Sequence, residues 1–200
     1  WNEARQDRNR GAELQQRLQV EFQEIRSEVD SAIEYHQDIV DAMNSLSRAV
    51  AAGNVADGDD DRVRYALDSA LKFSFGARRS ATWVDIVSSG QTGLLAIPEL
   101  RSAFSRYDEL HQGAKPLFAQ FWEGQRHHEV LFSRHFRYET ERRKEGEVFM
   151  PGEVVSYDVT AMSGDRDFQQ AMQRLMEYQV YYQIWHLQMG QAAEKVLALL

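Results

Sequence analysis

The sequence predicts an all-α fold, an elongated helical bundle organised along a long N-terminal helix. Three observations support this prediction. Apolar residues recur every three or four positions over three long stretches, which is the period of an amphipathic helix. No proline interrupts the first of these stretches. The length of 200 residues suits a single domain with a sizeable buried core, so residues 1–200 are expected to form one helical-bundle domain.

The first stretch covers residues 1–52, and its apolar stripe runs without a break. A helix over the first fifty residues would be about 75 Å long, so the other helices are expected to pack along it. The stripe consists of Leu14, Leu18, Phe22, Ile25, Val29, Ala32, His36, Ile39, Met43, Leu46 and Val50.

Shorter helices are predicted in the middle of the chain, where glycines mark the ends. Gly53 is expected to stop the first helix, and a second helix is predicted over about 60–75. A short helix over 82–88 follows, with Thr82 and the acid three residues later placed like a capping box. Gly90 would supply its left-handed stop.

The second half is predicted to contain two further long helices separated by an irregular segment. Pro98 suits the first position of a helix that extends to about Lys144, and Pro116 inside it predicts a kink or a local break. Residues 146–164 lack a helical period and are expected to form a strap or a small hairpin. The final helix, 166–200, alternates steps of four and three, which is typical of a coiled-coil seam.

The composition argues against several classes of function. The absence of cysteine excludes thiol catalysis, Cys-ligated zinc and disulfides. The net charge of −8 makes nucleic acid an unfavourable partner. No glycine-rich phosphate loop is present, and Ser88-Ser89-Gly90 lacks the first glycine of an esterase elbow. We therefore expect neither an enzymatic activity nor a cofactor.

Histidines provide the candidate buried chemistry. His36, His128, His135 and His186 lie on or beside the apolar stripes, where they form a candidate polar cluster that binds a metal or responds to pH. His128 and His135 differ by about 10 Å of helical rise, so a shared ion would need ligands from other helices. Phe132 stands where a zincin motif needs its second histidine. Hydrogen-bonded histidines within a helix interface are the favoured interpretation, and no metal site is predicted.

Aromatic residues provide the candidate partner surface. Aromatic side chains at helical spacing are by default core residues. Trp122 and Tyr181 fall just outside the apolar stripes, so both are expected to be exposed, where they could bind another protein.

Two groups of short motifs resemble a family of uncharacterised bacterial single-pass membrane-anchored proteins. One group comprises Thr82-Trp-Val-Asp-Ile-Val-Ser-Ser-Gly90, Leu94-Leu95, Glu99-Leu-Arg101 and Tyr107. The other is Trp1-Asn-Glu3 with Arg5, Arg8 and Arg10, which is similar to the point where the family's transmembrane helix ends and a long helix continues. The resemblance covers mainly 1–30 and 80–110. Ala96-Ile97-Pro98 departs from the family's usual Asn or Asp cap.

The resemblance implies an anchor in a bilayer just before Trp1, and tryptophan does favour the membrane–water interface. It also implies an extracytoplasmic, periplasmic location for the helical domain, although the arginines after Trp1 favour the cytoplasmic side. The family offers no catalytic residues. The expected role is therefore non-enzymatic: binding of a protein partner or ligand, or self-association as a homo-oligomer. The alternatives are a cytoplasmic helical scaffold and a metal- or pH-responsive sensor that uses the histidines.

Overall fold

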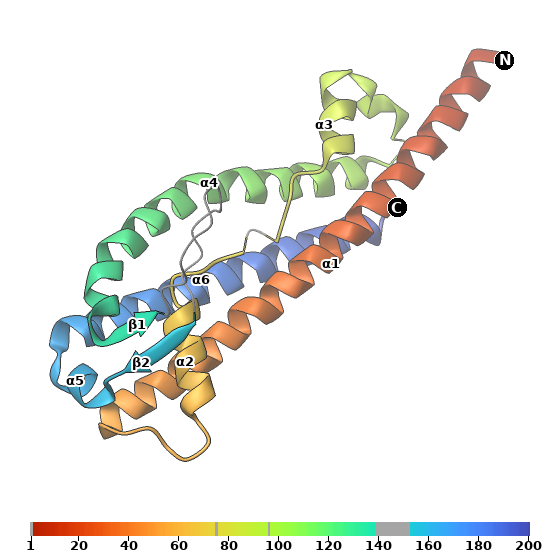
Figure 1. Ribbon diagram of the computed structural model, residues 1–200. Helices are drawn as coiled ribbons and strands as arrows, with labels where there is room; N and C mark the ends of the chain where they lie inside the picture. Colours follow the sequence, from red (N-terminus) through yellow and green to blue (C-terminus); the bar gives the residue numbers. More distant parts are fainter. Residues whose placement is uncertain (1, 75, 96, 139–152) are drawn as a thin grey trace, which may run out of the picture. The chain divides into compact units, whose positions relative to one another are not determined.

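The fold is all-α with a small two-stranded antiparallel sheet (Figure 1). The computed structural model describes residues 2–74, 76–95, 97–138 and 153–200. The elements in chain order are α1 (Asn2–Ala52), α2 (Asp60–Ser69), α3 (Ala81–Ser88), the 3₁₀ turn η1 (Gln91–Leu94), α4 (Pro98–Phe132), the 3₁₀ turn η2 (Ser133–His135), β1 (Phe136–Tyr138), β2 (Val154–Tyr157), α5 (Val159–Gly164) and α6 (Arg166–Leu197).

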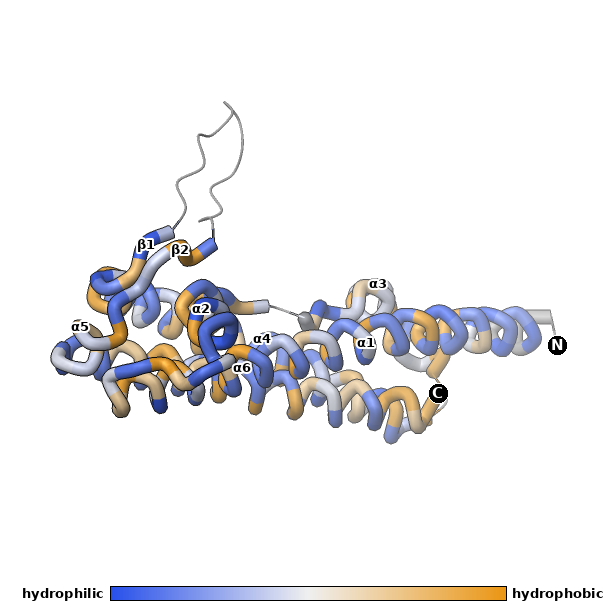
Figure 2. Tube along the Cα trace, turned by 60° about the horizontal axis from the view of Figure 1, so that its bottom comes forward, coloured by the Kyte–Doolittle hydropathy of each residue, from blue (hydrophilic) through white to orange (hydrophobic). Residues whose placement is uncertain are grey.

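The three long helices follow the three apolar stripes, which confirms the predicted fold class. Leu18, Phe22 and Ile25 of α1 are completely buried, and so is Leu175 of α6. Figure 2 shows apolar and polar residues alternating along each long helix. This alternation leaves one face of each helix to pack and the other to contact water.

Several predicted helix ends are confirmed. α1 ends immediately before Gly53, and Gly53 and Gly90 both adopt left-handed backbone conformations, with φ of 70° and 68°. Pro98 is the first residue of α4. The side chain of Asp165 accepts hydrogen bonds from two amides in the first turn of α6, as a capping residue does.

Other boundaries were predicted incorrectly. α2 ends at Ser69 rather than near residue 75, because the carbonyls that follow it bond to a side chain of α6. Ser80, not Thr82, caps α3 by accepting the N–H of Trp83. α4 continues through Pro116, so the predicted local break is wrong, because residues on both sides of this proline are buried and hold the helix. The kink, which was the other predicted outcome, stays a prediction.

The C-terminal end of α4 was also predicted incorrectly, and its correction explains the sheet. The helix ends at Phe132 rather than near Lys144, and 136–138 form β1. The alternation of Phe136, Arg137 and Tyr138 suits a strand, with Phe136 buried in the core. β1 pairs antiparallel with β2, so a strand does lie within the predicted 146–164 strap, although α5 forms its last part. Residues 146–152 lie outside the described residues.

The described chain divides into two compact units. Unit 1 comprises Trp1–Glu34, Phe75–Phe118 and Gln183–Leu200, and unit 2 comprises Tyr35–Ser74 and Ala119–Tyr182. The helices α1, α4 and α6 each contribute residues to both units. The prediction of a single domain stays a prediction.

In unit 1, aromatic contacts connect α1, α3 and α4. Phe22 of α1 meets Phe104 and Tyr107 of α4 edge-on, with ring centroids 5.2 and 5.1 Å apart. Trp83 of α3 stacks on Phe104 at 4.7 Å. These edge-on and stacked contacts stabilise the helix packing beyond the burial of area alone.

Unit 2 has a continuous apolar core of its own. It gathers side chains from α1, α2, α4, both strands, α5 and α6, and its fully buried members include Leu46, Leu67, Phe132 and Phe168. The rings of Phe132 and Phe168 are stacked with centroids 5.3 Å apart, which joins the end of α4 to the start of α6.

A buried carboxylate in unit 1 holds the start of α3 against α1. Glu21 accepts hydrogen bonds from the hydroxyl of Ser80 and from the amides of Ala81 and Thr82, at 2.9, 2.7 and 3.2 Å. It thereby satisfies N–H groups that have no partner within the helix.

Replacing Glu21 by Ala is expected to lower the free energy of unfolding by about 2–3 kcal/mol, because buried donors would lose their acceptor. Urea unfolding followed by circular dichroism measures the change. Glu24→Ala is the matched control: Glu24 is exposed and bonds only Arg78 among the described residues, so its loss should cost less than about 1 kcal/mol. Equal losses in the two variants would refute the capping role.

The backbone of Gly76 lies directly on α1. A Cβ at this position would come within 2.3 Å of the Ala32 Cβ and 2.7 Å of the Glu28 carbonyl oxygen. Only glycine permits so close an approach between backbones.

Gly76→Ala is therefore expected to destabilise the chain by about 1–3 kcal/mol through overpacking. Gly113→Ala, in α4, provides the comparison: nothing lies within 4 Å of its added Cβ, and alanine favours the helix, so stability should rise by about 0.5–1 kcal/mol. Thermal unfolding of the two variants beside the wild type tests both the expected loss of stability in Gly76→Ala and the expected gain in Gly113→Ala. A Gly76→Ala variant as stable as the wild type would contradict the close approach.

Candidate interaction surface

In unit 2, α4 and α6 approach closely at a glycine. A Cβ added to Gly124 would lie 2.2 Å from the hydroxyl oxygen of Tyr178 and 2.9 Å from the ring carbon that bears it. The missing side chain leaves room for the tyrosine ring against α4. The same ring lies 5.0 Å from Phe121, one turn earlier on α4.

This approach is part of a larger set of ring contacts, which we call the aromatic cluster. Its members are Phe73, Phe121, Trp122, Tyr178, Tyr181 and Tyr182. Tyr182 lies at its centre, stacked on Phe73 at 5.5 Å and edge-on to Phe121 at 5.7 Å. Rings packed in this way have few alternative rotamers, so the cluster presents a rigid surface.

Trp122 and Tyr181 form the exposed edge of the aromatic cluster. They are 49% and 52% exposed, as their positions outside the apolar stripes predict. Trp122 contacts Phe73 edge-on at 5.3 Å, and Tyr181 stacks on Phe121 at 5.5 Å. Each exposed ring is thus supported from behind by a more buried ring.

The inner end of the cluster is polar. His36 is completely buried and stacks on Tyr182 at 5.3 Å. Its Nδ1 lies 2.7 Å from Oε1 of Gln179, and the Gln179 amide nitrogen donates to the carbonyls of Ala70 and Lys72 at 3.0 and 2.7 Å. Burial lowers the pKa of His36, and its hydrogen bonds oppose this effect in part.

Gln179, which makes these bonds, is not among the candidate residues that the sequence pattern indicates. It lies four residues after Leu175 and three before Tyr182, on the buried face of α6. The spacing places this glutamine on the buried face of the helix, and a buried amide requires hydrogen-bond partners. This was the signal in the sequence that could have identified Gln179.

The other candidate histidines have different surroundings. Nε2 of His135 lies 2.8 Å from a carboxylate oxygen of Asp165, and this hydrogen bond joins η2 to the cap of α6. The ring centroids of His128 and Tyr178 are 6.4 Å apart. Burial, with His127 and Arg174, lowers the pKa of His128. His186 is completely buried in unit 1. The described ranges contain no group of three or more histidine, aspartate or glutamate residues that could hold a metal ion.

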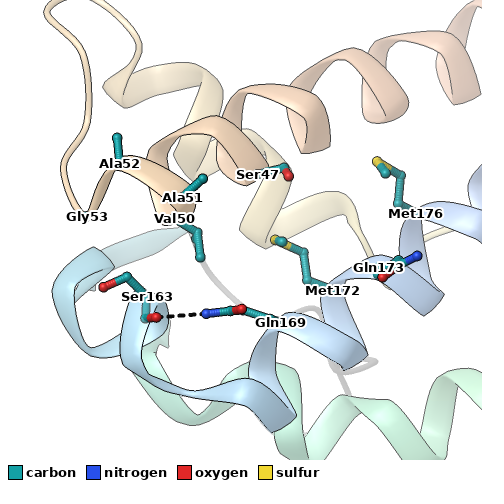
Figure 3. Close-up of a pocket in the computed structure, with 10 residues that line it drawn as sticks. All are labelled: Ser47, Val50, Ala51, Ala52, Gly53, Ser163, Gln169, Met172, Gln173 and Met176. Carbon is teal, nitrogen blue, oxygen red and sulfur yellow. Dashed lines mark hydrogen bonds between the residues drawn. The ribbon is translucent and has the colours of Figure 1, made fainter.

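Unit 2 also carries an open groove of about 630 Å³ between the end of α1 and the first turns of α6 (Figure 3). At one end, Gln169 donates a hydrogen bond to the carbonyl of Ser163 at 2.8 Å. The lining residues are Ser47, Val50, Ala51, Ala52, Gly53, Ser163, Gln169, Met172, Gln173 and Met176, none of which is charged. The groove therefore suits an uncharged group.

Comparison with known proteins adds no assignment to these sites. A scan against protein-family models, a search of curated proteins and a search of solved structures found no match.

Gln125 of α4 is a second buried glutamine of unit 2, only 3% exposed. Neither its amide nitrogen nor its amide oxygen has a hydrogen-bond partner among the described residues. Gln179, by contrast, uses both ends of its amide. The two side chains thus form a natural pair for comparing a buried amide with and without partners.

Replacing Gln125 by Met, which has a similar shape, should leave stability unchanged or raise it by about 1–2 kcal/mol, because an unpartnered amide leaves the core. Gln179→Met should cost at least about 2 kcal/mol, because two carbonyls and His36 lose their partner. Denaturant unfolding of both variants provides the measurement. Similar losses in the two would show that Gln125 is also hydrogen-bonded, for example to a buried water.

Proposed function

We propose that this chain is the non-enzymatic, helical part of a membrane-anchored protein and that it binds another protein through the exposed edge of the aromatic cluster. The observation that carries the binding proposal is the pair Trp122 and Tyr181, which are half exposed. Trp122 packs on the half-buried ring of Phe73, and Tyr181 packs on the buried ring of Phe121. Tryptophan and tyrosine are the residues on which binding energy most often concentrates in protein interfaces.

The rigidity of the pair supports binding. An interface residue that must be ordered on association loses conformational entropy, which weakens affinity. Trp122 rests on Phe73 and Tyr181 rests on Phe121, so both rings are already held in the free protein. Little further ordering is required when a partner docks.

Charged residues flank both rings. On α6, Arg174 and Glu177 form an ion pair at 2.7 Å, and they lie about two turns and one turn before Tyr181, respectively. On α4, exposed Glu123 and Arg126 lie beside Trp122. An apolar centre with a polar rim is the usual anatomy of a protein interface. Because the net charge of −8 opposes contact between two copies, a different chain is the favoured partner over self-association.

The anchor and the periplasmic location are proposed from the resemblance of the N-terminal motifs alone. Each helix among the described residues is either too short or too polar to span a bilayer. The cytoplasmic-scaffold alternative keeps the same binding surface and removes the anchor. Sequencing the gene upstream of Trp1 separates the two, because an anchored protein needs about 20 consecutive apolar residues there.

The groove in Figure 3 supports a second candidate, binding of an uncharged ligand or partner group at the end of α1. Ala51→Leu would fill the groove from an exposed position and leave the aromatic cluster unchanged. Loss of binding in this variant alone would assign the function to the groove.

Trp122→Ala and Tyr181→Ala are each expected to weaken partner binding at least about tenfold, because a packed interface aromatic contributes more than about 1.4 kcal/mol. Sedimentation velocity tests binding to a second copy. Photo-crosslinking from position 126 in the native host, followed by binding measurements with the purified captured protein, tests binding to another chain. Melting temperatures should change little, since both side chains are half exposed.

Val130→Ala is the matched control on α4, because Val130 is 69% exposed and lies outside the aromatic cluster. It should bind as the wild type does. The proposal fails if the two aromatic variants bind like the wild type in both assays.

A further inference from the structure

The buried imidazole of His36 contacts the backbone of the segment that follows α2. Its Nε2 lies 3.4 Å from the amide nitrogen of Ser74 and 3.4 Å from the carbonyl oxygen of the same residue. One ring nitrogen thus faces a donor and an acceptor at the same distance. It can bond to only one of them in each protonation state.

The hydrogen bonds of Gln179 identify the tautomer of the neutral ring. The Gln179 nitrogen faces two carbonyls, those of Ala70 and Lys72, so the amide cannot be turned around without placing oxygen against oxygen. Its Oε1 is therefore directed at His36, and an amide oxygen only accepts. Nδ1 of His36 must carry the hydrogen, and Nε2 accepts the N–H of Ser74.

A second proton reverses the bond at Nε2. The protonated ring is a donor at both nitrogens, so it keeps the bond to Gln179 and can donate to the Ser74 carbonyl. The Ser74 amide then loses its acceptor. Phe73, the neighbouring residue, stacks on Tyr182 and contacts Trp122, so a shift of this backbone reaches the aromatic cluster.

Two tyrosine rings contact the imidazole of His36, those of Tyr35 on α1 and Tyr182 on α6. Burial raises the pKa of Tyr35 to about 12 and also raises that of Tyr182, so both remain neutral near pH 7. Burial lowers the pKa of His36, and the hydrogen bonds with Gln179 and Ser74 raise it in part.

We infer that His36 is a proton-operated switch at the end of α2, which holds the Ser74 N–H when neutral and the Ser74 C=O when protonated. The switch changes the backbone of 70–74 and, through Phe73, the support behind Trp122. It does not depend on the proposed partner binding, because its readouts lie within unit 2 itself.

The sign of the pH effect follows from the lowered pKa of His36 in the folded state. The unfolded chain binds this proton more tightly, with a pKa of about 6.5. The stability contributed by the neutral ring is therefore fully present above about pH 6.5 and is lost as the pH falls from there towards the lower folded value.

Nuclear magnetic resonance of the full chain tests the switch directly. Long-range ¹H–¹⁵N correlation at pH 7.5 should show the Nδ1–H tautomer for His36. Hydrogen exchange, corrected for the intrinsic effect of pH, should show that protection of the Ser74 amide falls at least about tenfold between pH 7.5 and the lower pH at which the ring signals of His36 report its protonation. An Nε2–H tautomer, or unchanged protection at Ser74, would overturn the inference.

Two variants separate His36 from general acid effects. In His36→Asn the side chain cannot titrate, so the fall in protection at Ser74 should be absent. His127→Asn removes an exposed histidine of the same unit and should retain the fall. If His36→Asn does not fold, the tautomer and the exchange at Ser74 in the wild type, with His127→Asn as control, still decide the question.

Discussion

The burial of one continuous apolar face on each of the three long helices is the constraint on which the structure depends. Leu18, Phe22 and Ile25 on α1 and Leu175 on α6 are completely removed from water. Burial of such side chains supplies most of the free energy of folding. The short elements then serve to cover parts of these faces that the long helices leave open, as α3 does with Trp83 in unit 1.

Polar groups inside these faces have to be paired, and their pairing determines where the short elements lie. Glu21 and His36 both lie on α1. Glu21 accepts hydrogen bonds from the first backbone amides of α3, and His36 contacts the backbone of the segment that follows α2. Glu21 holds the start of α3, and His36 together with Gln179 holds the end of α2. An unpaired buried carboxylate or imidazole would be costly, so these bonds restrict the position of the connecting chain.

The proposed partner surface and the proposed switch belong to the same aromatic cluster of unit 2. Trp122 lies at its exposed edge and His36 at its buried end, with Phe73 and Tyr182 between them. Packed rings transmit displacement because the interior has few voids into which a side chain can relax. A protonation event inside unit 2 can therefore reach the proposed partner surface.

The sequence by itself determined the helical class, the course of α1, α4 and α6, and the stops at Gly53 and Gly90, because periodicity and backbone preference are local properties. It also determined that Trp122 and Tyr181 are exposed. Only the tertiary structure decided that β1 replaces the end of the second long helix, that α2 stops at Ser69, and that Gln179 is the partner of His36. These features depend on bonds between residues far apart in the chain, such as Phe136 with Tyr157 and Gln179 with Ala70, which no local pattern encodes.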